Sequence, residues 1–135
     1  MNTDFNELVE ASRMAHNRNG VHNLWKAAIS LPEWFFVADG HDEDAEPIIG
    51  AVDRQPHVIV FTDQAGAEHF STQRAAQKGG EPTAVLTMPV ADAVAYFEDL
   101  SSGGVEGALF NSGEYGFRAG LMEIRDMYAR YTRPR

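Results

Sequence analysis

The residues that could do chemistry lie next to the expected ends of strands. Thr62-Asp63 directly follows an apolar run and precedes an expected helix. Ligands of α/β proteins often bind at such strand-to-helix junctions. The carboxylate of Asp63 is expected to cap the helix, which contributes about 1 kcal/mol, and ligand binding is its alternative role. His69, Asn111 and Arg118 are further polar residues that could meet Asp63 around the strand ends.

Other familiar catalytic patterns are absent from the sequence. No serine lies in a Gly-x-Ser-x-Gly motif, so the nucleophile elbow of a hydrolase is missing. Gly79-Gly80 and Gly103-Gly104 each follow an expected helix and precede an expected strand. Loops that bind phosphate run in the opposite order, from strand to glycines to helix. Both glycine pairs therefore predict helix ends, and we predict no catalytic residue.

Metal-ligating patterns are missing as well. The acidic loop, defined here as residues 39–46, lacks the Asp-x-Asp-x-Asp-Gly spacing of a calcium loop. The five histidines show no His-x-x-x-His spacing, and the absence of cysteine excludes thiolate sites. The sequence therefore predicts no metal and no cofactor, and the acidic loop is interpreted as a solvated hairpin tip.

The charge of the chain is uneven. The net charge is −9, but residues 118–135 contain five arginines against two acidic residues and carry +3, which leaves −12 on the rest. This balance repels nucleic acid and anionic membranes, so neither is expected as a partner. The same acidity argues against a base-stacking strand at Tyr115-Gly116-Phe117-Arg118. Arg125 and Arg130 are expected to complement a helix dipole, with docking to an acidic partner as the alternative.

Length and composition predict a single domain. A chain of 135 residues is long enough to bury a substantial core. The N-terminus has no basic start followed by an apolar stretch, and no apolar run approaches the roughly 20 residues needed to span a bilayer. These features predict a cytoplasmic protein.

The elements that would position these residues follow from hydrophobic spacing. Helices are expected at 4–19, 21–30, 63–78, 89–102 and 121–131, and strands at 32–38, 47–53, 56–61, 83–88, 105–110 and 115–118. The first three strands predict an antiparallel meander, because short turns or loops separate them. The expected fold is α+β (α/β-like), with a single mixed sheet of about six strands packed by four to five helices. Its buried residues are predicted to be Trp34, Phe36, Val52, Ile59, Phe61 and Leu109.

The chain also resembles the SseB N-terminal-domain family, named from an enhanced-serine-sensitivity protein. The resemblance covers roughly residues 22–128 and rests on Leu24-Trp25-Lys26-Ala27-Ala28, Leu31-Pro32-Glu33-Trp34-Phe35-Phe36-Val37, Gly50-Ala51-Val52-Asp53, Val60-Phe61-Thr62-Asp63, Met88-Pro89-Val90-Ala91-Asp92-Ala93, Gly104-Val105-Glu106-Gly107 and Phe110-Asn111. It implies a compact α/β domain without an agreed biochemical activity. Residues 1–20 lie outside the resemblance, and residues 21–131 form the expected core of one SseB-like domain.

Two hypotheses about function follow. The favoured one is a non-enzymatic, cytoplasmic protein-interaction or regulatory module that binds another protein. The alternative is a small-molecule-binding or weakly hydrolytic domain that uses polar residues at the strand ends, and it gains support if Asp63, His69, Asn111 and Arg118 surround one cleft. The candidate partner- or ligand-binding residues are Asp63, His69, Asn111, Tyr115, Arg118, Arg125 and Arg130.

Overall fold

The computed structural model describes residues 4–14 and 19–133, which form five helices and six strands. The helices are α1 (Phe5–Ser12), α2 (Gly20–Ile29), α3 (Gln64–Lys78), α4 (Val90–Ser102) and α5 (Leu121–Tyr131). The strands are β1 (Glu33–Val37), β2 (Ile49–Val52), β3 (Gln55–Val60), β4 (Val85–Pro89), β5 (Gly107–Phe110) and β6 (Phe117–Gly120). The α+β class is as expected. Among the described residues, no helix is long and apolar enough to cross a membrane.

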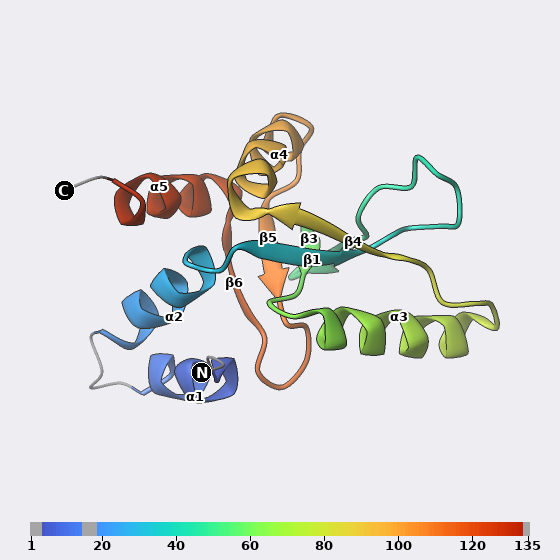
Figure 1. Ribbon diagram of the computed structural model, residues 1–135, viewed down its shortest axis with the longest axis horizontal. Helices are drawn as coiled ribbons and strands as arrows, with labels where there is room; N and C mark the ends of the chain where they lie inside the picture. Colours follow the sequence, from blue (N-terminus) through green and yellow to red (C-terminus); the bar gives the residue numbers. More distant parts are fainter. Residues whose placement is uncertain (1–3, 15–18, 134–135) are drawn as a thin grey trace.

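The strands form two sheets, whereas the sequence predicts one. Strands β2, β3, β5 and β6 form a four-stranded sheet in that order, and β1 pairs antiparallel with β4 in a separate ribbon. Isolated bridges from Phe35 to Phe61 and from Ala38 to Pro47 connect the ribbon to the larger sheet. Figure 1 shows α3 and α4 on opposite sides of the β1–β4 ribbon.

The predicted meander is therefore wrong in its first half. β2 and β3 do form an antiparallel hairpin, and Asp53 and Arg54 turn it with φ of 50° and 69°. β1 does not continue this ladder, and its five residues pair with β4. Among the described residues, only the Ala38–Pro47 bridge joins the end of β1 to the segment before β2, with hydrogen bonds from the N–H of Ile48 to the carbonyl of Val37 at 3.0 Å and from the N–H of Asp39 to the carbonyl of Glu46 at 2.8 Å.

A parallel pair in the larger sheet brings distant polar residues together. The chain runs from β3 through α3, β4 and α4 before it returns as β5, parallel to β3. His57 to Val60 lie in register with Gly107 to Phe110. The carboxyl ends of β3 and β5 therefore meet at one edge, where Thr62-Asp63 and Asn111 follow them.

The main core lies between the sheets and helices α2, α4 and α5. The ring of Trp34 is fully buried, stacks on Phe97 and meets Phe110 edge-on, with centroid distances of 5.8 and 4.9 Å. Its indole N–H donates to the carbonyl of Ala28 at 2.9 Å. A smaller cluster under α3 includes Ile59 and Phe61.

Two of the core predictions are confirmed only in part. Trp34, Phe36, Ile59 and Phe61 are buried as predicted, but Val52 and Leu109 are only half-buried. Val52 ends the short edge strand β2, where only one neighbouring strand is present. Leu109 lies in register with Ile59 and packs against the small cluster only from the side.

Several boundaries also differ from those expected. α1 ends at Ser12, earlier than the predicted residue 19, and residues 15–18 of that predicted helix lie outside the described residues. The sixth strand begins at Phe117, two residues later than expected. Helix α3 follows the prediction: Asp63 caps its start, and Gly79 ends it in the left-handed conformation with φ of 73°.

Candidate functional site

A cleft of about 520 Å³ opens at the carboxyl edge of the parallel strands β3 and β5. Its size suits a small ligand, for which pockets usually measure about 300–1,000 Å³. We call it the strand-end cleft. Four of the predicted candidates line it, namely Asp63, His69, Asn111 and Tyr115. The other lining residues come from the start of α1 and from around α3 and β5: Asp4, Phe5, Asn6, Phe61, Thr62, Gly66, Phe70, Gln73 and Ser112.

Hydrogen bonds between Thr62 and Asn111 tie together the two strand ends. The backbone N–H of Thr62 donates to Asn111 Oδ1 at 3.0 Å, and Asn111 Nδ2 donates to Thr62 Oγ1 at 2.9 Å. The backbone N–H of Asn111 donates in turn to the carbonyl of Val60 at 2.9 Å. Asn111 holds φ of 53°, a left-handed conformation that asparagine adopts more readily than most residues. Its side chain thus has a structural role at this edge.

Two helices begin at the strand-end cleft, and an aspartate caps each of them. Asp63 Oδ1 accepts from the backbone N–H of Gly66 at 2.7 Å at the start of α3. Asp4 Oδ1 accepts from the backbone N–H groups of Asn6 and Glu7 at 3.0 and 3.3 Å at the start of α1. The expected capping role of Asp63 is confirmed. Each cap uses one carboxylate oxygen, and the described residues give the second oxygen of neither aspartate a hydrogen-bond partner.

Aromatic side chains supply apolar surface in the same cleft. Phe61 is buried and packs on Phe70, with ring centroids 5.4 Å apart. Phe5 and Tyr115 are half-exposed and belong to α1 and the β5–β6 loop. Phe5 stacks on Phe117 of the main core at 6.3 Å, so this part of the wall is anchored to the core. The strand-end cleft therefore combines aromatic surface with a few polar groups.

Acidic residues surround Tyr115 at the same site. The pKa of Tyr115 is raised above its ordinary value. The largest cause is the hydrogen bond of the phenol to the Glu10 carboxylate, and the charge of Glu114 raises the pKa further. The charge of Arg13 acts in the opposite direction, and its guanidinium donates to the carbonyl of Gly116 at 3.1 Å. The phenol therefore lies near two carboxylates and one guanidinium.

Arg118 lies apart from the other candidates. Its guanidinium pairs with Asp53 on the β2–β3 turn at 2.7 Å, with both side chains well exposed. It lines a second cleft, of about 380 Å³, with the buried His57 and with Glu106 and Glu123. The structure therefore brings together three of the four residues whose convergence would favour small-molecule binding, and leaves out Arg118.

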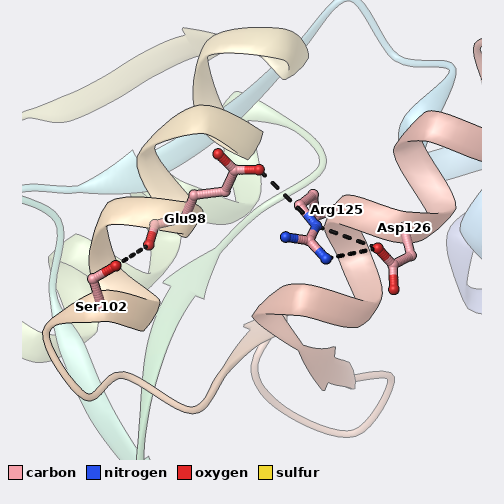
Figure 2. A network of polar contacts seen from close by, with 4 residues as sticks. All are labelled: Glu98, Ser102, Arg125 and Asp126. Carbon is pink, nitrogen blue, oxygen red and sulfur yellow. Dashed lines mark hydrogen bonds and ion pairs between the residues drawn. The ribbon is translucent and has the colours of Figure 1, made fainter.

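Arg125 and Arg130 lie on α5, which supplies no residue of the strand-end cleft. Figure 2 shows Arg125 between Asp126, at 3.1 Å, and Glu98 of α4, at 4.0 Å. Both contacts are exposed ion pairs, which typically contribute only about 0–1 kcal/mol. Arg130 lies exposed in the last turn of α5.

The described residues of the strand-end cleft include no paired nucleophile and base. Ser112 and His69 both line it, but the described residues show no hydrogen bond between them or from His69 to Asp63. A nucleophile needs a base within hydrogen-bond reach. Within 4–14 and 19–133, no cluster of three or more His, Asp or Glu residues could hold a metal ion.

Sequence reasoning missed the contribution of α1 to this site. Asp4, Phe5 and Asn6 line the strand-end cleft, although the first 20 residues lie outside the family resemblance and outside the predicted site. Gln73 and Ser112 were also missed. The alternation of strands and helices from β3 to β5 was an available signal, because such alternation favours parallel strands with adjacent carboxyl ends.

Compared with protein-family models and with curated proteins, the chain has no significant match.

Proposed function

We propose that this protein is a non-enzymatic small-molecule-binding domain and that the strand-end cleft is its binding site. One observation carries the proposal: Asp63, His69, Asn111 and Tyr115, which are far apart in sequence, line a single cleft at the carboxyl edge of two parallel strands. Convergent polar groups beside apolar surface are the usual composition of ligand sites. This is the alternative predicted from sequence, with its hydrolytic part set aside.

The cleft is supported in a way that suits specific binding. The Thr62–Asn111 hydrogen bonds hold two strand ends, and the caps at Asp4 and Asp63 fix the starts of two helices. Polar groups held in this way lose little conformational entropy when a ligand binds, so less binding energy is spent on ordering them.

A ligand-observed NMR screen of small polar metabolites tests the proposal. We expect at least one compound to bind the wild-type protein and to lose binding in His69→Ala and in Ser112→Trp, which adds a bulky ring at the cleft wall. Gln77→Ala is the matched control, since Gln77 is exposed on the same helix and lies outside the cleft. Hits that bind all three variants like the wild type would place the site elsewhere.

Protein interaction, favoured from sequence, is a second proposal. Its support is the distribution of charge: the acidic loop and α5, which carries Arg125 and Arg130, lie at opposite ends of the molecule (Figure 1). Such a separation would steer a charged partner and act mainly on association rate. Neutralising Arg125 and Arg130 should then slow association with a captured partner. An unchanged association rate would show that α5 does not steer the partner. Membership of the SseB-like family and a cytoplasmic location also remain proposals, resting on the motifs and composition of the chain.

A further inference from the structure

The charged side chains of the strand-end cleft are of one sign. Asp4 and Asp63 line it, and among the described residues neither lysine nor arginine does. Of the lining residues that the structure describes, only His69 has a titratable nitrogen. The negative charge of the lining therefore bears on whether the ligand is a cation, a neutral molecule or an anion.

The two helix N-termini reduce this negative charge without reversing it. A helix N-terminus carries about half a positive elementary charge, whereas each capping aspartate carries a full negative one. Asp4 and Asp63 already accept the backbone N–H groups of Asn6, Glu7 and Gly66, which are among the groups that would bind an anion at a helix N-terminus. A phosphate or carboxylate ligand would have to compete with Asp4 and Asp63 for these N–H groups, and the negative charge of both aspartates would repel it.

The aromatic walls suit the same class of ligand as the carboxylates. Phe5, Phe70 and Tyr115 are half-exposed in the cleft, and aromatic faces attract cations as well as apolar groups. Glu10 and Glu114, which act on Tyr115, add negative charge beside the phenol, and the positive charge of Arg13 offsets part of it. A cleft of about 520 Å³ is also far larger than a bare metal ion requires.

We propose that the strand-end cleft binds a small organic cation, with an ammonium or guanidinium group at the free carboxylate oxygens of Asp4 and Asp63 and an apolar body against the aromatic walls. This inference rests on the proposed function and deepens it, because it specifies the chemical class of the ligand.

Three probes of the same shape and different charge test the inference: phenethylamine, 2-phenylethanol and 3-phenylpropionate. Their affinities are measured by titration of the 135-residue chain, followed by amide chemical shifts. We expect phenethylamine to bind at the cleft about three- to tenfold more tightly than 2-phenylethanol, and 3-phenylpropionate to bind most weakly. Added salt should weaken the binding of phenethylamine only.

Asp63→Asn separates charge from structure, because asparagine caps helices about as well as aspartate. We expect this variant to remain folded and to lose about three- to tenfold in affinity for phenethylamine, with 2-phenylethanol unaffected. Asp92→Asn is the control, since Asp92 is exposed in the first turn of α4 and its loss changes the net charge equally.

Equal or tighter binding of 3-phenylpropionate at the cleft would overturn the cation inference and leave the proposed function standing. Failure of all three probes to bind at millimolar concentration would also overturn it, and the metabolite screen would then decide on the proposed function. Equal losses in Asp63→Asn and Asp92→Asn would show an effect of net charge alone and would contradict the assigned role of Asp63.

Discussion

Asn111 allows a quantitative test of how the strand-end cleft is held together. Its Oδ1 accepts from the backbone N–H of Thr62, a residue only 7% exposed, and its backbone holds φ of 53°. Asn111→Ala removes the acceptor and leaves a partly buried N–H unpaired, which costs about 1–3 kcal/mol. Alanine in the left-handed region costs about 1 kcal/mol more. The expected loss in free energy of unfolding is therefore about 2–4 kcal/mol.

Two matched variants separate these contributions. Asn111→Gly loses the same hydrogen bonds but tolerates the left-handed backbone, so it should be about 0.5–1 kcal/mol more stable than Asn111→Ala. Asn111→Asp keeps an acceptor for the Thr62 N–H, so its free energy of unfolding should fall less than that of Asn111→Ala or Asn111→Gly. Urea denaturation followed by circular dichroism gives the three values. A loss below about 0.5 kcal/mol in Asn111→Ala would refute the structural role of these hydrogen bonds, since that is the smallest net value expected for one.

Three further predictions concern the core, the cleft and the acidic loop. Trp34→Ala should lower the free energy of unfolding by roughly 3–5 kcal/mol, because the ring is fully buried; a loss of a few tenths would show that it is exposed in solution. Glu10→Gln should lower the pKa of Tyr115 toward its ordinary value, measured by NMR titration of the phenol, and an unchanged pKa would exclude the assigned contact. The acidic loop should bind no calcium, magnesium or zinc tightly in titration calorimetry, and micromolar binding abolished by Asp42→Asn would contradict its interpretation as a solvated hairpin tip.

Local features of the fold could be predicted from the sequence because each rests on nearby residues. The apolar runs around Trp34 and Ile59 identify strands, and in β3 successive apolar side chains alternate between the two clusters, with Val58 and Val60 in the main core and Ile59 in the smaller one. Asp63 and Gly79 mark the ends of α3 through a cap and a left-handed residue. These signals depend on backbone chemistry within a few positions.

Strand pairing depends on contacts that the local sequence does not specify. β1 pairs with β4, about fifty residues away in the chain, and a long acidic loop separates it from β2. Both candidate partners are short apolar strands, so hydrophobic pattern alone favours the nearer one. The two-sheet arrangement therefore could not be predicted from strand propensity.

The candidate site was predictable only in part for the same reason. Asp63 and Asn111 each follow a strand, and they meet because β3 and β5 are parallel neighbours. Arg118 is also a polar residue near a strand end. Because β6 runs antiparallel to β5, however, the Arg118 guanidinium lies away from the cleft and pairs with Asp53. The share of the cleft that α1 supplies depends on how the helix pair α1–α2 packs on the rest of the fold.

An amide chemical-shift map with a bound small-molecule ligand tests the central claim most directly. The strand-end cleft, as the binding site, predicts the largest shifts in three separate segments, residues 4–6, 61–73 and 111–115. Shifts that instead centre on His57 and Arg118, at the second cleft, would contradict the account.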